Sequence, residues 1–358
     1  MLRRCLVALV VLVPVVAGGT AASAYPGAPW FRPAHVYTGN FPDPSVLRVG
    51  HRYYAYGTST GGAYLPIMSS TDLRQWVARP GYADGAMGPG LHNDGLPQPA
   101  RWAVDRPVVN RLSKELWAPG VAQIGGRFVA FYAARVSLDR DRFCLSVATS
   151  ADPLGPFTDT STAPLHCDAD PNGSIDPQPF VDADGTPYLL WKSEGDPGRA
   201  PTRIWARRLA PSGTAFAPGS TPTVLLQTSQ RWEGRVVENP SMVRWSGRLL
   251  LFYSGNEHAS AAYATGYADC RTPLGPCTKW GGNPVLRSRG TQLGPGGAAA
   301  FVDHLGGLRL AYHWWNAPFT SYPAWPACES TRSCTTQGQR RMSVVAVTAD
   351  PRTGSLVV

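Results

Sequence analysis

Hydrophobic and polar positions along the chain recur as short apolar runs paired across tight turns. In residues 237–254 an acidic residue and a proline precede an apolar run, the turn Ser246-Gly247, and a second run that ends in aromatic residues. Apolar, β-rich residues on both sides of such a turn predict two antiparallel strands joined in a hairpin. Four further copies of this pattern begin near residues 43, 117, 175 and 294.

The spacing of the copies predicts an all-β fold, a five-bladed β-propeller. Counted from Asp43, Pro119, Asp176, Glu238 and Gly297, the intervals are 76, 57, 62 and 59 residues, which is about the size of one propeller blade. The chain has 38 Gly and 34 Pro among 358 residues, and no long stretch has the 3.6-residue period of a helix. Residues 80–113, rich in Gly, Pro and Asn, interrupt the pattern and are expected to form an insertion.

Three of the five repeated positions are acidic: Asp43, Asp176 and Glu238. The first strand of each propeller blade lines the central channel, so we expect the three carboxylates to meet at one mouth of that channel. For any one of these acids, capping of a strand or turn is the better explanation, but three in register around a ring weaken that explanation. Glu233 is a competing acid, but it precedes the first-strand position of its copy.

The first 24 residues are predicted to be a secretory signal peptide. Arg3 and Arg4 precede an apolar run from Leu6 to Ala17, and small residues before position 25 suit signal peptidase. We expect cleavage after Ala24, an extracellular protein, and a single propeller domain over residues 25–358. An uncleaved membrane anchor is the alternative.

Cysteine usage agrees with export. Loss of Cys5 with the signal peptide leaves an even number, as expected for disulfides in an oxidising compartment. Sequence proximity suggests three pairs: Cys144–Cys167, Cys270–Cys277 and Cys328–Cys334. A zinc site is a weaker interpretation, because no CxxC spacing occurs among these cysteines.

The charge distribution argues against a nucleic-acid partner. The net charge is +9, and removal of Arg3 and Arg4 with the signal peptide leaves +7. These basic residues are scattered rather than clustered into a patch. We expect a monomer that binds neither nucleic acid nor membrane.

The motifs together resemble those of the family-43 glycoside hydrolases, five-bladed propellers that act on arabinose- and xylose-containing plant polysaccharides. The motifs are Asp43-Pro44-Ser45-Val46, Leu116-Trp117-Ala118-Pro119, Ile175-Asp176-Pro177 with the Asp184-Gly185 turn, and Val237-Glu238-Asn239-Pro240. The resemblance implies that Asp43 is the general base, Glu238 the general acid, and Asp176 a third carboxylate that orients Glu238. Gly120 and Gly297 depart from the resemblance, because many members have Asp and His there.

These roles suit hydrolysis with inversion of configuration. A base activates water on one face of the sugar and an acid protonates the leaving oxygen on the other, with the two carboxyls roughly 6.5–9.5 Å apart. A negative charge on Asp176 is expected to raise the pKa of Glu238 and keep it protonated.

Aromatic residues and one histidine complete the predicted site. Trp117 and Phe41 are expected to stack on the apolar faces of sugars, whereas Trp314 and Trp315 suit core packing equally well. His313 matches a family histidine that faces calcium or water in the central channel. The chemistry requires no cofactor, and a structural calcium near His313, held directly or through water, remains an open alternative.

We therefore expect a secreted, inverting glycoside hydrolase acting on arabinofuranosyl linkages, the favoured substrate, or on xylosyl linkages of plant polysaccharide. A non-catalytic propeller lectin is the alternative. The presence of all three acids favours the enzyme, because a protein that only binds sugar does not need them.

Overall fold

The structure is a computed structural model that describes residues 39–60, 63–79, 94–108, 111–196, 198–322 and 338–358. All of these residues belong to one compact unit, Pro33–Val358. The predicted signal peptide and the predicted pair Cys328–Cys334 lie outside the described residues.

The five-bladed β-propeller is confirmed. Four sheets have four strands each, one has three, and in every sheet the strands pair in sequence order as an antiparallel meander. The blades are β1 (Ser45–Val49), β2 (Arg52–Tyr56), β3 (Ile67–Ser70) and β4 (Val77–Ala78); β7 (Leu116–Ile124), β8 (Arg127–Arg135) and β9 (Phe143–Ser150); β10 (Ser174–Val181), β11 (Pro187–Ser193), β12 (Arg203–Arg208) and β13 (Thr223–Gln227); β14 (Val237–Trp245), β15 (Arg248–Gly255), β16 (Ala264–Cys270) and β17 (Cys277–Lys279); and β18 (Gln292–Val302), β19 (Leu308–Asn316), β20 (Arg340–Ala349) and β21 (Leu356–Val357).

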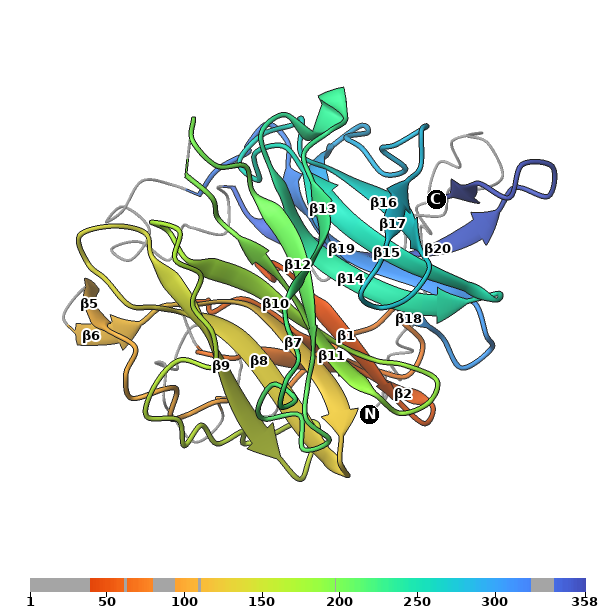
Figure 1. The fold of residues 1–358 in the computed structure, drawn as a ribbon. Coiled ribbons are helices and arrows are strands. Elements are labelled where there is room, and N and C mark those ends of the chain that lie inside the picture. The colour runs from red at the N-terminus through yellow and green to blue at the C-terminus, as the bar shows by residue number, and fades with distance from the viewer. Residues whose placement is uncertain (1–38, 61–62, 80–93, 109–110, 197, 323–337) are drawn as a thin grey trace, which may run out of the picture. The chain divides into compact units, whose positions relative to one another are not determined.

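The first strands of the blades form the inner ring. Each packs against the first strand of the next blade, and β18 packs against β1 to close the circle (Figure 1). Within the predicted insertion, β5 (Asp105–Val108) and β6 (Arg111–Lys114) form a separate hairpin. The described residues contain no α-helix; the single helical turn is the 3₁₀ helix η1 (Arg231–Glu233). None of their helices is long and apolar enough to cross a membrane.

The hydrophobic core lies between neighbouring blades. In β15, Leu249 and Leu251 face the cluster shared with the third blade, whereas Leu250 and Phe252 face the cluster shared with the fifth. All four are at most 3% exposed. A strand covered on both faces is apolar at successive positions rather than at alternate ones, which explains the continuous apolar runs in the sequence.

Each first strand carries a local kink near its start. Five residues have positive φ there: Asp43 (51°), Ala118 (42°), Asp176 (55°), Asn239 (52°) and Gly297 (58°). The strand register also shifts at this point in β7, β10, β14 and β18. Such bulges redirect side chains and are common beside active sites.

The kinks correct one expectation from the sequence. Asp43 and Asp176 occupy equivalent positions, but the equivalent residue in the fourth blade is Asn239, and Glu238 lies one residue before it. The three acids therefore do not stand in strict register around the ring. Asn and Asp tolerate positive φ better than most residues, which accounts for their use at this position.

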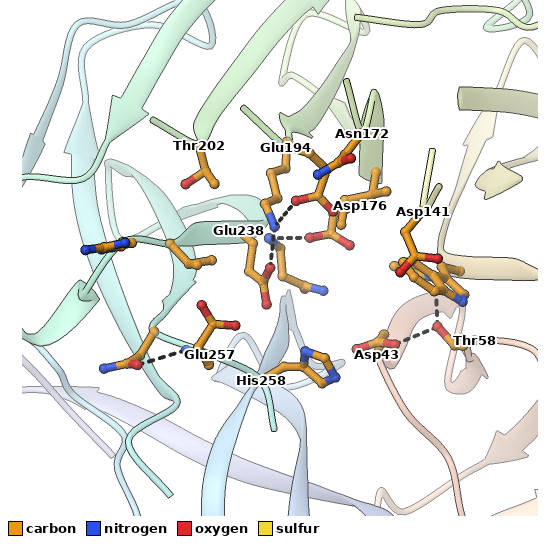
Figure 2. Close-up of a pocket in the computed structure, with 18 of the residues that line it drawn as sticks. Asp43, Thr58, Asp141, Asn172, Asp176, Glu194, Thr202, Glu238, Glu257 and His258 are labelled. Carbon is orange, nitrogen blue, oxygen red and sulfur yellow. Dashed lines mark hydrogen bonds and ion pairs between the residues drawn. The ribbon is translucent and has the colours of Figure 1, made fainter. Parts of the chain in front are cut away.

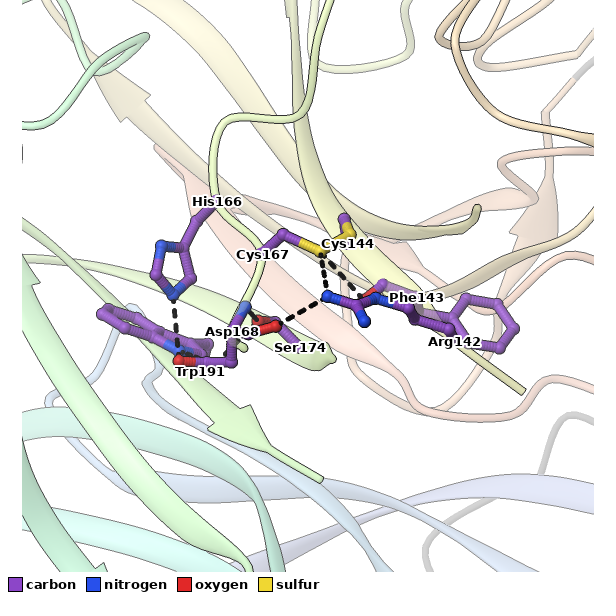
Figure 3. Close-up of a disulfide and its surroundings, with 8 residues drawn as sticks. All are labelled: Arg142, Phe143, Cys144, His166, Cys167, Asp168, Ser174 and Trp191. Carbon is purple, nitrogen blue, oxygen red and sulfur yellow. Dashed lines mark hydrogen bonds and ion pairs between the residues drawn. A yellow bond between two sulfur atoms is a disulfide. The ribbon is translucent and has the colours of Figure 1, made fainter. Parts of the chain in front are cut away.

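Two of the three predicted disulfides are present. Cys144–Cys167 ties β9 to the segment that leads into the third blade, and Cys270–Cys277 joins β16 to β17. Beside the first bond, Arg142 donates a hydrogen bond to the carbonyl oxygen of Asp168, and the Asp168 carboxylate accepts one from Trp191 (Figure 3). This bond and its neighbours hold the segment that contains Asn172. Asn172 lines the cavity that is described next.

Candidate active site

A cavity of about 1070 Å³ opens where the first strands begin, and residues from all five blades line it. Asp43, Asp176 and Glu238 all line this cavity and point toward the same space (Figure 2). The structure therefore brings together the three carboxylates that the sequence singled out, although the chain separates them widely. Glu233 does not line the cavity. It is fully buried and accepts hydrogen bonds from Lys279 and Tyr253.

Asp43 is held as an ionised carboxylate. Arg340 of β20 donates to both of its oxygens at 2.9 and 3.1 Å, and the Thr58 hydroxyl donates to Oδ2 at 2.6 Å. Burial by itself would raise the pKa of Asp43, but Arg340, His313 and Thr58 outweigh burial and hold that pKa well below its usual range. An ionised carboxylate at neutral pH is suited to accept a proton.

Glu238 is held by one donor on each oxygen. Lys192 of β11 lies 2.7 Å from Oε2, and the Tyr263 hydroxyl donates to Oε1 at 2.7 Å. Its side chain is 12% exposed. Burial raises the pKa of Glu238, but the charge of Lys192 and the hydrogen bonds outweigh burial and lower it overall.

Asp176 is the most buried of the three acids, at 5% exposed. Its Oδ2 accepts a hydrogen bond at 2.9 Å from the backbone N–H of Asn239, next to Glu238 in the chain. Burial and then the negative charge of Glu238 raise the pKa of Asp176 well above its usual value. Asp176 therefore binds the strand that carries Glu238 directly, consistent with a role in orienting it.

These environments correct the expected electrostatics of the pair. The sequence predicted that Asp176 keeps Glu238 protonated, but in the structure the lowered pKa belongs to Glu238 and the raised pKa to Asp176. The reason is Lys192, whose ammonium pairs with Glu238. Lys192 contacts Glu238 rather than Asp176, so its charge favours the ionised form of Glu238 more strongly than that of Asp176.

Similar hydrogen bonds between blades hold the kinked positions elsewhere in the ring. The N–H of Ala118 donates to Thr58 Oγ1 at 2.7 Å, and the N–H of Gly297 donates to Ser254 Oγ at 2.9 Å. The N–H of Asp43 donates to His313 Nδ1 at 3.1 Å. Because a side chain of the preceding blade accepts each bond, the blades fix the direction in which each kinked residue points.

The two aromatic residues that were predicted to stack on sugars lie in different environments. Trp117 lines the cavity and stacks on Phe143 with ring centroids 3.8 Å apart, so its position suits a sugar platform. Phe41 is fully buried in a core cluster with Ala55, Met68 and Met342, and it does not line the cavity. The expectation that Phe41 contacts sugar is therefore corrected. Trp314 and Trp315 are also buried in the core, at 5% and 0% exposed.

His313 is fully buried beside Asp43, and its Nε2 has no hydrogen-bond partner among the described residues. Because Nδ1 accepts the backbone N–H of Asp43, the neutral ring carries its hydrogen on Nε2, which then offers a metal no lone pair. No group of three His, Cys, Asp or Glu side chains in the described part of the chain is arranged to hold a metal. A calcium ion near His313 would therefore have to be held through water. Gly120 is one of the two positions that depart from the family resemblance. A Cβ added there would meet the backbone of the third blade.

Sequence reasoning missed four residues that surround the acids: Lys192, Glu194, Tyr263 and Arg340. Lys192 and Glu194 had a usable signal, because two charged residues follow the apolar run of β11 at its end, in the blade that carries Asp176. Arg340 had none, since nothing in the sequence connects it to Asp43, 297 positions away.

The fold and the site together define a class: a β-propeller whose central cavity presents carboxylates in unlike environments, as glycoside hydrolysis requires. A model of the glycosyl hydrolases family 43 matches residues 34–339. The chain therefore belongs to family 43 of the glycoside hydrolases.

Individual relatives are distant. The chain is 29% identical over 221 residues to an arabinan endo-1,5-alpha-L-arabinosidase A of Aspergillus niger, covering 56% of this chain and 65% of that protein. It is 26% identical over 185 residues to an extracellular endo-alpha-(1->5)-L-arabinanase of Thermotoga petrophila, covering 46% and 35%. The chain thus spans less than two thirds of either relative.

Solved structures agree with the propeller fold. A thermostable family-43 glycoside hydrolase matches with a TM-score of 0.68 and 25% identity, covering 92% of this chain and 95% of that one. An endo-1,4-beta-xylanase of Bacteroides thetaiotaomicron matches with a TM-score of 0.66 and 25% identity, covering 90% and 96%.

Proposed function

We propose that this glycoside hydrolase is secreted and hydrolyses arabinofuranosyl linkages of plant polysaccharide with inversion of configuration. The observation that carries the proposal is the contrast between two carboxylate environments in one cavity. Asp43 is held ionised by Arg340, whereas burial and the charge of Glu238 raise the pKa of Asp176, the close neighbour of Glu238. Titratable groups whose environments push their pKa values apart are the usual sign of a base and an acid.

In the proposed reaction, Asp43 accepts a proton from a water molecule as the water oxygen bonds to the anomeric carbon. The glycosidic C–O bond breaks at the same time. Glu238 takes up the proton that the Asp176–Glu238 pair binds, and it donates that proton to the departing oxygen. Arg340 keeps Asp43 ionised, and Asp176 holds the backbone beside Glu238 through Asn239. Trp117 supports a sugar ring from the second blade.

The choice of arabinose rests on the relatives. The two curated proteins reported above are named as acting on arabinan, but a solved neighbour is named as a xylanase. Xylosyl linkages are therefore the alternative substrate. Cys144–Cys167 and Cys270–Cys277 support export, because disulfides persist in oxidising compartments.

A substrate screen tests this proposal. The purified protein is assayed on nitrophenyl arabinofuranoside, debranched arabinan, nitrophenyl xyloside and xylobiose, with products separated by size. The anomer first released is identified by NMR. We expect hydrolysis of the arabinose substrates and an inverted product. Activity on xylobiose alone would refute the arabinose assignment, a retained anomer would refute inversion, and sugar binding without hydrolysis would favour a lectin.

A further inference from the structure

Lys192 occupies an unusual position in the cavity. It lies on β11, whose preceding residues Leu189, Leu190 and Trp191 are fully buried, and it is itself 4% exposed. Its ammonium is 2.7 Å from Glu194 Oε2 and 2.7 Å from Glu238 Oε2. Burying a lysine is costly unless its charge is paired. The two glutamates meet this need, and Figure 2 shows both of them among the residues that line the cavity.

This arrangement acts on Glu238 in two ways. Lys192 on Oε2 and the Tyr263 hydroxyl on Oε1 together restrict how the carboxyl can turn. The ammonium also favours the ionised form of Glu238, although an acid catalyst must carry a proton. Glu194 opposes this effect, because its negative charge neutralises part of the charge that Glu238 experiences.

We propose that Lys192 is a positioning residue that fixes the direction of the Glu238 carboxyl and, balanced by Glu194, sets the pH above which Glu238 no longer donates a proton. The inference rests on the proposed role of Glu238 as the acid. Neither Lys192 nor Glu194 needs to touch the substrate for this role.

Other charged groups around Glu238 must be considered in any pH argument. Asp176 faces it from β10, while Tyr263 and His258 come from the segment between β15 and β16. Asp43 and Arg340 face the same cavity from the first and fifth blades and pair with each other. Lys192 and Glu194 differ from these groups, because Lys192 contacts Glu238 directly and Glu194 pairs with Lys192 through the opposite charge.

The test compares pH–rate profiles of Lys192→Met, Glu194→Gln and the double variant on an arabino-oligosaccharide, whose leaving group requires protonation. The basic limb of kcat/KM reports the acid of the free enzyme. Removing the ammonium should move this limb up by about one pH unit, since a contacting opposite charge shifts a carboxyl by one unit or more. Glu194→Gln should move the limb down, and the double variant should lie between the two.

Lys279 provides a matched control. It forms a buried ion pair with Glu233 at 2.6 Å in the fourth blade, and neither residue lines the cavity. Lys279→Met should lower the melting temperature and leave the basic limb where it is. If Lys192→Met does not fold, the downward shift in Glu194→Gln still tests the inference.

The outcomes separate the inference from the function on which it rests. A wild type that hydrolyses none of the substrates overturns the proposed function, and the inference with it. An active wild type whose basic limb is unmoved in Lys192→Met and Glu194→Gln overturns the inference alone and reduces the pair to a structural ion pair. Shifts of opposite sign support it.

Discussion

Replacing Gly120 by Ala tests how closely the second and third blades must pack for the site to form. Gly120 lies on β7, two residues after the kink at Ala118, and β7 packs against β10. A Cβ added at Gly120 would meet the carbonyl oxygen of Pro177, and would lie 2.6 Å from Pro179 Cδ and 2.9 Å from Gln178 Cα. Pro177 directly follows Asp176, so the contact is with the part of the backbone that positions an active-site acid.

The size of the effect follows from these contacts. The crowded atoms belong to backbone and proline ring, which cannot rotate away as a flexible side chain can. Overpacking of this kind costs about 1–3 kcal/mol. Ala lowers the conformational entropy of the unfolded chain relative to Gly, which offsets about 0.4–1 kcal/mol of this lost stability. The net loss, up to about 2.6 kcal/mol, should lower the melting temperature by up to roughly 4 °C in a domain of this size.

The assay is thermal unfolding with kcat/KM measured on the same preparations. Because relief of the clash moves β10 relative to β7, we expect kcat/KM to fall as well as the melting temperature. Gly281→Ala is the matched control, since nothing lies within 4 Å of its added Cβ, and it should change neither quantity. A Gly120→Ala protein with unchanged stability and activity would refute the argument that this contact fixes the blades.

Four further predictions concern the acids and one disulfide. Glu238→Gln should lower hydrolysis of arabino-oligosaccharides by about 10²–10⁴-fold but spare a nitrophenyl substrate, whose leaving group needs no proton; equal loss on both would contradict its role as the acid. Asp43→Ala should impair both substrates alike, and azide should yield no product of retained configuration; a variant that keeps most of its rate would exclude Asp43 as the base. Asp176→Asn should retain activity with the basic limb of its pH–rate profile moved downward, because the raised pKa belongs to Asp176 and its loss leaves Glu238 with the pKa that Lys192 lowers; an upward shift would show that the two carboxyls are not coupled in this way. Replacing Cys144 and Cys167 by Ser should lower the free energy of unfolding by about 2–4 kcal/mol, measured by urea denaturation, and weaken substrate binding through the segment that carries Asn172; unchanged stability would indicate that the bond is not formed.

The sequence alone determined the blades, because a propeller repeats one simple unit. Apolar runs of strand length on both sides of a Gly turn specify a hairpin locally, and their spacing specifies how many hairpins there are. The same repetition revealed Asp43, Asp176 and Glu238, since acids at comparable places in separate blades converge in space. Cys144–Cys167 and Cys270–Cys277 were also predictable, because cysteines close in sequence meet easily within one blade or in the segment that follows it.

Only the tertiary structure decided where each side chain points and which charges it meets. A kink at the start of each first strand moves Glu238 one residue out of register with Asp43 and Asp176, and no apolar pattern reports such a kink. Phe41 and Trp117 looked alike as aromatics beside a motif, yet one is buried in the core and the other lines the cavity. Whether an acid holds a proton depends on the charges within a few ångströms of it, and Lys192 and Arg340 come to those positions from other blades.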